Sequence, residues 1–246
     1  MMKTALRTFA LTFAAAAFLC GCGKGSGEPD TPDGPDTPVD PVTPVEKVYS
    51  VGDYYSKGFV KGVVVSVSTD EDGKQHGLVV SLKESEAAWA YRNDDVMSGQ
   101  PGTGAYNTGC VQKLSGWKDY YPAFVDATSE NVGALKDWFL PSMNELAQLY
   151  KAYTGHEAND SEQGTGSLQS VSRQSVEMSE VEYKAKFNKS LTDNKGTALS
   201  DAIYWSSSES GPSIAYAFDM QSGKTVDIPS ELDKKKVYKV RAMASF

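Results

Sequence analysis

The stretch DWFLPSMNELAQLYKAYTG, residues 137–155, contains the clearest helix signal in the sequence. Ser142 and Glu145 stand in the S-x-x-E spacing of a capping box, in which each side chain bonds the other residue's backbone N–H. Gly155 stands where a residue that ends a helix is expected. Four apolar residues recur at i, i+3, i+4 and i+7: Leu146, Leu149, Tyr150 and Tyr153. The stretch therefore predicts a capped amphipathic helix with one buried face.

A second helix and several strands are predicted around this segment. Ser179 and Glu182 repeat the capping box and begin a helix predicted over 179–194. Two valine-rich runs, 60–67 and 78–82, are joined by turn residues and predict a β-hairpin. Three strand-like segments follow the second helix: 202–209, 213–228 and 236–246. The order of strands, then helices, then strands predicts an α+β fold.

Two stretches lack these patterns. Residues 98–109 are rich in glycine, but they lack the lysine and the following helix of a P-loop, so we interpret them as part of a turn-rich surface loop. Residues 156–178 are polar and rich in serine, and they predict a long loop excursion. Asp70 and its acidic neighbours lack the remaining ligands of a calcium loop, so we expect no metal and no cofactor.

The beginning of the chain has the pattern of a bacterial lipoprotein signal. Lys3 and Arg7 precede an apolar run, 9–19, that is too short to span a bilayer. The run leads into the sequence LCGC, residues 19–22, in which Cys22 follows a small residue. Cleavage before Cys22 would leave its thiol free for lipid attachment, and several acyl chains make a stable anchor. An ordinary secretory signal with an incidental cysteine is the alternative.

This signal divides the chain into three parts. We expect a signal peptide over 1–21, a lipidated cysteine with a disordered Pro- and Asp-rich tether over 22–47, and a single domain over 48–246. Cys110 then remains as the one cysteine of that domain, where we expect a small buried side chain. The chain is thereby predicted to be an outer membrane lipoprotein that faces the periplasm or the cell surface.

The charge of the protein is unfavourable for binding nucleic acid. The net charge is −8 and the isoelectric point is near 4.9, so the overall electrostatic field repels phosphate backbones. The densest basic stretch is 234–236, which we interpret as a solvated hairpin edge. Arg241 lies in an apolar strand, where we expect it to pair with a carboxylate such as Asp219 or Glu209.

Several motifs together resemble a known family. DWFLPSMNELAQLY is followed by YWSSSE, AYAFDMQSGK and a terminal VRAMASF, over about 137–246. This order resembles the C-type-lectin-like domains found at the C-terminus of bacterial collagen-like (Lcl) adhesins, here in a lipoprotein like those of Gram-negative gut anaerobes. The resemblance implies a mixed or antiparallel sheet with two main helices, in which the last strand pairs with the first. The calcium motifs and disulfides of animal lectins are absent from the sequence.

The stretch YWSSSE, residues 204–209, has two interpretations. In the structural one, Tyr204 and Trp205 are strand aromatics, one buried and one nearer the surface, while the serines and Glu209 bond backbone groups. In the binding one, Trp205 stacks on a sugar and Ser208 and Glu209 bond its hydroxyl groups. Trp138 and Asn144, beside the first helix, are further candidate ligand contacts.

Catalysis is not expected from these residues. A serine nucleophile would need His76 or His156 as its base, and no glycine elbow surrounds the serines. The resemblance implies an adhesin that binds a glycan or another host ligand and contacts the membrane through its N-terminal lipid. The alternative is a structural or accessory subunit of an envelope or pilus-like assembly that binds a protein partner.

Overall fold

The predicted hairpin forms the centre of the first sheet. In the computed structural model, which describes residues 47–96, 102–131, 137–158 and 178–246, β2 (Val60–Thr69) pairs antiparallel with β3 (Gln75–Ser81). Val63 and Val64 of β2 and Val79 and Val80 of β3 are buried. The valine-rich runs therefore predicted this hairpin correctly, because β-branched side chains favour a pleated, half-buried surface.

The first sheet is antiparallel, and the C-terminal strand has a different hydrogen-bonded neighbour from the one predicted. The C-terminal strand pairs with β3 and not with the first strand, and Met243 lies opposite Val80. The first strand already pairs with β2 across a two-residue turn, whereas the other edge of β3 offers apolar partners to Met243 and Ala244. The strand order is β1 (Tyr54–Lys57), β2, β3, β10 (Met243–Ser245) and β5 (Trp138–Phe139).

The second sheet contains the YWSSSE stretch in its central strand. β6 (Ile203–Gly211) pairs antiparallel with β7 (Ile214–Asp219) and parallel with β9 (Val237–Val240), and Tyr204 lies opposite Lys239. The pairing with β7 is irregular between Trp205 and Glu209, so the three serines lie in a bulged part of the strand. The strand order is β4 (Ser85–Ala88), β9 (Val237–Val240), β6 (Ile203–Gly211), β7 (Ile214–Asp219) and β8 (Lys224–Thr225).

Both predicted helices are present with their capping boxes. α4 spans Met143–Thr154 and α5 spans Glu180–Asp193, and in each the serine at the N-cap and the glutamate three residues later bond reciprocally. Gly155 ends α4 with φ of 80°, a left-handed conformation that glycine adopts without steric cost. α4 and α5 contact each other and β2. The predicted loop excursion between them falls mostly on 159–177, outside the described residues.

Three short helices were not predicted, and the first of them begins within the stretch 98–109 that was interpreted as loop. α1 spans Gly104–Gln112, α2 spans Trp117–Tyr120 and α3 spans Pro122–Ala127. α1 turns two polar side chains, Asn107 and Thr108, toward the interior, so it lacks the apolar periodicity on which a prediction depends. Cys110, expected to be buried, is only half-buried on this helix.

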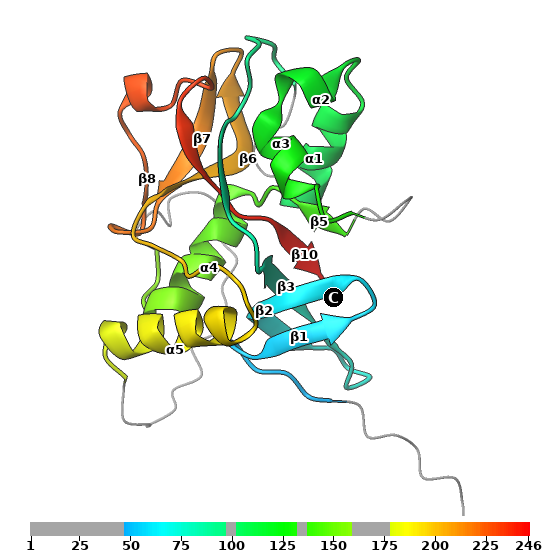
Figure 1. Cartoon of the computed structure of the whole chain (residues 1–246), viewed down its shortest axis with the longest axis vertical. Helices are drawn as coiled ribbons and strands as arrows, with labels where there is room; N and C mark the ends of the chain where they lie inside the picture. Colours follow the sequence, from blue (N-terminus) through cyan, green and yellow to red (C-terminus); the bar gives the residue numbers. More distant parts are fainter. Residues whose placement is uncertain (1–46, 97–101, 132–136, 159–177) are drawn as a thin grey trace, which may run out of the picture. The chain divides into compact units, whose positions relative to one another are not determined.

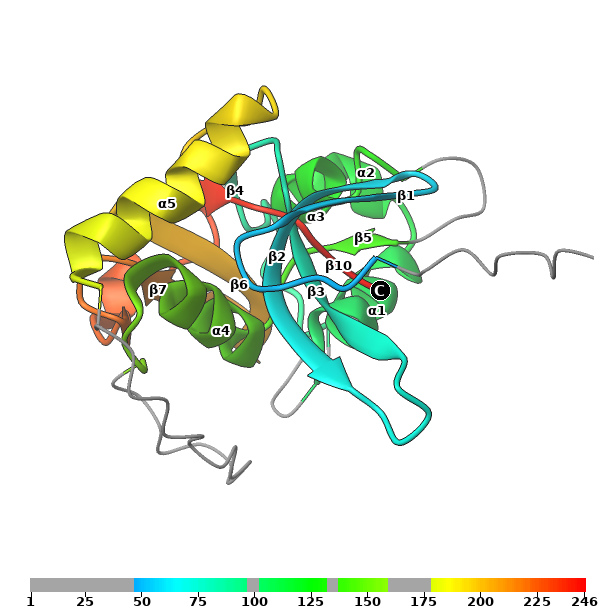
Figure 2. The same cartoon turned by 90° about the horizontal axis from the view of Figure 1, so that it is seen from below.

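The helices lie on two sides of the sheets, as Figures 1 and 2 show: α4 and α5 on one side, α1 to α3 on the other. A single-turn 3₁₀ helix, Pro229–Glu231, precedes β9. This arrangement confirms the predicted α+β class. In the described part of the chain, none of the helices combines the length and the apolar character needed to cross a bilayer.

Candidate functional site

The two aromatic residues of YWSSSE lie in the core. Tyr204 packs in the cluster around α4 and α5, whereas Trp205 packs in the cluster beneath α1 and α3. Both side chains are fully buried, because helices cover both faces of β6. The Trp205 indole Nε1 donates to Ala87 O at 3.0 Å. The prediction that one of the two lies near the surface was therefore wrong, and Trp205 presents no face on which a sugar could stack.

The serines of the stretch are also enclosed. Ser206 Oγ donates to Tyr216 O at 2.7 Å, and Ser207 Oγ accepts a hydrogen bond from Asn107 Nδ2 at 3.1 Å. Ser208 Oγ is buried and has no partner among the described residues. The possible bases lie elsewhere: His76 pairs with Asp70, and both of these side chains are largely exposed. The serines thus support the bulge of β6 rather than line an open site.

Glu209 forms a buried ion pair with Lys234, which was predicted on a solvated edge. The Lys234 side chain is 0% exposed and that of Glu209 is 3% exposed. Lys234 lies inside because its backbone pairs with Ser213 O and Ala90 N, which turns its side chain beneath the 94–96 loop. Lys235 and Lys236 are exposed, in agreement with the prediction.

The Glu209–Lys234 pair connects the loop of residues 94–96 to the core by hydrogen bonds. Lys234 Nζ also donates to Asp94 O and Pro212 O, each at 2.9 Å, and lies 4.5 Å from the centre of the Trp89 ring. Glu209 Oε2 accepts a hydrogen bond from Val96 N at 2.9 Å. Burial raises the pKa of Glu209 and lowers that of Lys234, and in each case the opposite charge counteracts the shift. Glu209 is therefore occupied by structural contacts.

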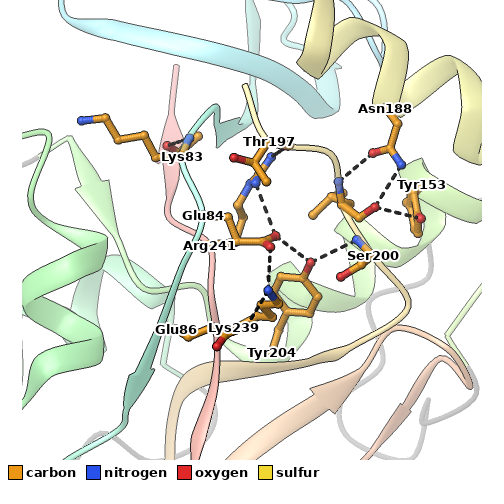
Figure 3. Close-up of polar contacts among 12 residues, drawn as sticks. Lys83, Glu84, Glu86, Tyr153, Asn188, Thr197, Ser200, Tyr204, Lys239 and Arg241 are labelled. Atoms are coloured by element: carbon orange, nitrogen blue, oxygen red, sulfur yellow. Dashed lines mark hydrogen bonds and ion pairs between the residues drawn. The ribbon is translucent and has the colours of Figure 1, made fainter. Parts of the chain in front are cut away.

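A second buried network surrounds Arg241 (Figure 3). Its partner is Glu84 and not Asp219 or Glu209, with 3.4 Å between Nη1 and Oε2, while Nη2 donates to Thr197 O at 2.7 Å. Tyr204 donates its hydroxyl to the same Glu84 oxygen at 2.8 Å. Lys239 reaches Oε1 of Glu84 at 3.4 Å. Burial and the Glu84 charge raise the pKa of Tyr204, which keeps its hydroxyl a donor.

The remaining predicted site residues do not assemble into a surface. Trp138 is buried in β5, and its backbone forms two hydrogen bonds with the Asn131 side chain. Asn144 is exposed on the first turn of α4. The structure brings only Trp205, Ser208 and Glu209 together, within β6. Cys22, the predicted lipid attachment residue, lies outside the described residues.

One pocket on the described surface is lined mainly by polar and charged residues. It has a volume of about 130 Å³ beside the Glu84 network. Ser81 Oγ donates to Glu130 at 2.6 Å and Ser85 Oγ donates to Asp126 at 2.7 Å, so its polar groups bond one another. Within the described ranges, no three His, Cys, Asp or Glu side chains are grouped to hold a metal ion.

Another pocket combines aromatic rings with lysines. We call it the aromatic pocket; its volume is about 280 Å³. Three rings line it, with centroids 4.9 Å apart for Tyr49 and Tyr55 and 4.6 Å apart for Tyr55 and Phe246. None of the described lining residues is acidic. They are Tyr49, Tyr55, Phe246, Lys47, Lys57, Lys74, Val48, Gly73 and Gln75.

Three separate chain segments build the aromatic pocket. The Gln75 amide, at the start of β3, accepts a hydrogen bond from Tyr49 N at 2.7 Å and donates to Tyr49 O at 3.0 Å, which fixes the entering segment. Phe246 exchanges two backbone hydrogen bonds of 3.1 Å with Gly77. A Cβ at position 77 would lie 2.8 Å from the Phe246 ring, so only glycine permits this approach.

The chemistry of the aromatic pocket suits an anionic ligand with a flat apolar face. Lys47 Nζ lies 4.7 Å from the centre of the Tyr49 ring, and Lys74 is exposed at the turn before β3. The lysines are the charged side chains among the described lining residues, while Asp70, Glu71 and Asp72 precede Lys74 in the same turn. Sequence reasoning missed the pocket because residues 49, 55 and 246 have no common spacing or motif.

The described residues thus define an α+β protein with two sheets, two capped helices and an open aromatic and basic pocket. No protein-family model and no curated protein matches the sequence. A solved structure described as a fimbrial protein from Bacteroides ovatus has a similar fold, with a TM-score of 0.51 and 16% identity. The similarity covers 80% of this chain and 49% of the fimbrial protein, so this chain matches about half of that protein's length.

Proposed function

We propose that this chain is a lipid-anchored binding protein of the cell envelope, without catalysis, whose ligand site is the aromatic pocket. The observation behind the proposal is the pocket itself, in which Tyr49 and Phe246 provide partly exposed ring faces, the buried Tyr55 ring supports them, and three lysines provide cationic donors. The lipoprotein signal that ends at Cys22 supports an outer membrane location, facing the periplasm or the cell surface.

A glycan is the first class of ligand in this proposal. The C–H groups on one face of a sugar ring carry partial positive charge, and they pack well on the negative face of an aromatic ring. Lysine side chains donate hydrogen bonds to sugar hydroxyl and carboxylate groups. The sequence resemblance to C-type-lectin-like adhesins also supports glycan binding, although the rings here belong to the first sheet and not to YWSSSE.

A glycan array tests this function. The full chain in detergent is applied to neutral and anionic glycans, first with calcium and then with a chelator. We expect binding that survives chelation and that weakens about tenfold in Lys74→Glu, because a favourable charge contact becomes repulsive. Lys235→Glu is the matched control, since it makes the same charge change on another exposed lysine. A lack of binding to every glycan, or equal weakening in both variants, contradicts the proposal.

An accessory subunit of a pilus-like assembly is the second candidate. The similarity in fold to the Bacteroides ovatus fimbrial protein supports it, because this chain matches about half of that protein. In this case the pocket binds a protein partner. Cross-linking in envelopes of cells that carry the full chain should then give high-mass products that contain other envelope proteins as well as this chain. Products that contain only copies of this chain, or no cross-linked product, together with glycan binding, exclude this candidate.

A further inference from the structure

The segment EPDTPDGPDTPVDPVTPVE, residues 28–46, has a strict three-residue repeat. It lies outside the described residues, immediately before Lys47. Aspartate follows three of its prolines directly, at positions 30, 33 and 36, and the segment contains no lysine or arginine. The prolines stand at every third position: Pro29, Pro32, Pro35, Pro38, Pro41 and Pro44.

The three-residue spacing of the prolines matches the period of the polyproline II helix. A polyproline II helix repeats every three residues and rises about 3.1 Å per residue. When 28–46 adopts it, the six prolines share one edge, and Asp30, Asp33 and Asp36 share another. Aromatic-lined grooves recognise such segments, because the conformation is already extended and little entropy is lost on binding. The repeat therefore describes a ligand with an apolar edge beside an anionic edge.

The aromatic pocket offers the complementary surface. The partly exposed Tyr49 and Phe246 rings, with centroids 6.0 Å apart, provide faces for proline rings, and the buried Tyr55 ring packs against both. Lys57 is the last residue of β1 and Lys74 directly precedes β3, and both line the pocket on the side where the aspartate edge would lie. Both the apolar and the charged features of the segment thus have counterparts in one pocket.

We propose that the aromatic pocket binds the Pro- and Asp-rich segment 28–46 of a second copy of this chain. A second copy is the occupant because Lys47, the next residue after the segment, itself lines the pocket, so a reversal within one copy would require a closed loop. The inference rests on the proposed function, because it uses the same pocket as the ligand site. The ligand in this case is a segment of another copy of the chain. Copies anchored in one membrane meet at high effective concentration, so a weak contact suffices.

A peptide titration tests this proposal. A fluorescent peptide of residues 28–46 is added to the full chain in detergent, and its anisotropy is measured. We expect saturable binding that weakens about tenfold or more when Lys57 and Lys74 are both changed to glutamate. The matched control is Lys118→Glu with Lys235→Glu, which makes the same change in net charge on exposed lysines elsewhere. Raising the salt to about 1 M should also weaken binding, because it screens exposed charges.

Two control peptides separate recognition from simple charge attraction. The first has the same composition in an order that removes the three-residue spacing of the prolines, and the second has asparagine at positions 30, 33 and 36. Both should bind about tenfold more weakly than the natural segment. Equal affinity for the natural and reordered peptides, equal loss in the pocket and control variants, or a lack of saturable binding overturns the proposal.

The peptide titration and the glycan array together show whether the self-association alone is wrong or the proposed function is wrong as well. If the peptide does not bind, while Lys74→Glu still weakens binding on the glycan array, the pocket is a ligand site and only the self-association is wrong. If neither the peptide nor any glycan depends on Lys74, both are wrong. A correctly folded Lys57→Glu, Lys74→Glu variant, verified by its unchanged thermal unfolding, ensures that loss of binding reflects the pocket.

Discussion

The ring of Phe246 lies against the ring of Tyr55, with 4.6 Å between their centroids. Phe246 follows β10 and Tyr55 lies in β1, so this contact joins two strands of the first sheet that are not hydrogen-bonded neighbours. Tyr55 is buried, whereas Phe246 and Tyr49 are partly exposed. The wall of the aromatic pocket is therefore an exposed edge of the core, which holds the rings in place before any ligand arrives.

Phe246→Ala should destabilise the protein by about 2 kcal/mol. A fully buried Phe→Ala change costs about 3–5 kcal/mol, and Phe246 is only partly buried, so part of that loss is expected. Unfolding in denaturant measures the difference. Val237→Ala, at a residue that is 59% exposed, is the control and should change stability by less than about 0.5 kcal/mol. Equal effects in the two variants would show that the Phe246 ring does not support the sheet.

The Glu209–Lys234 pair should behave as a unit. Lys234→Met leaves a buried carboxylate without its ammonium partner and should cost about 3–5 kcal/mol. Lys234→Met combined with Glu209→Leu removes both charges and should cost clearly less than the sum of the single changes. Urea unfolding of the three variants measures this coupling. Strictly additive effects would mean that the two charges do not depend on each other.

The contribution of Glu145 to the free energy of unfolding should decrease as the pH rises. Burial is the main cause that raises the pKa of this carboxyl above its usual value, against the hydrogen bonds from Ser142 and Gly104. The folded state then binds more protons than the unfolded state above pH 4.5, so the stability from Glu145 is present at low pH and is lost as the pH passes the folded-state pKa.

Glu145→Gln isolates this effect from the other carboxyl groups. An amide oxygen can still accept the hydrogen bonds from Ser142 N and Gly104 N, but it does not titrate. The stability of the variant relative to the wild type should therefore increase as the pH rises from the usual carboxyl pKa to the raised folded-state pKa of Glu145, by at most about 1.4 kcal/mol per pH unit. Thermal unfolding at several pH values provides the measurement, and a constant difference contradicts the assignment.

The two capping serines should differ in their contribution to stability. Replacing an N-cap serine by alanine usually costs about 1 kcal/mol. Ser142 is buried, and its hydroxyl also contacts Glu145, so Ser142→Ala should cost about 2 kcal/mol. Ser179 has the same capping box in an exposed position, and Ser179→Ala should cost about 1 kcal/mol or less. The reverse order in denaturant unfolding would show that burial at α4 is not decisive.

Local patterns predicted the elements whose causes are local. The capping boxes at Ser142 and Ser179 and the valine-rich hairpin depend on residues within one turn or one strand pair, so the sequence displays them directly. α1 was missed because its inward side includes Asn107, whose burial depends on a distant serine in β6. Helix prediction from apolar spacing has no access to such a contact.

The candidate site required knowledge of tertiary contacts. YWSSSE contains polar and aromatic residues that suit a surface site, yet β6 is covered on both faces, and alternation along one strand cannot reveal this. Lys234 gave the opposite error, because a lysine in a basic run is usually solvated and this one meets Glu209 in the core. The aromatic pocket brings together Tyr49 and Phe246, which are separated by almost the whole sequence of the domain.

The most direct test of the account compares Tyr49→Ala with Trp205→Phe on the glycan array, with the full chain and in chelator. Tyr49 lines the aromatic pocket, whereas Trp205 is buried in the YWSSSE stretch. We predict that Tyr49→Ala loses most of the binding and that folded Trp205→Phe binds as the wild type does. Normal binding by Tyr49→Ala together with loss of binding in folded Trp205→Phe would contradict the account and return the site to YWSSSE.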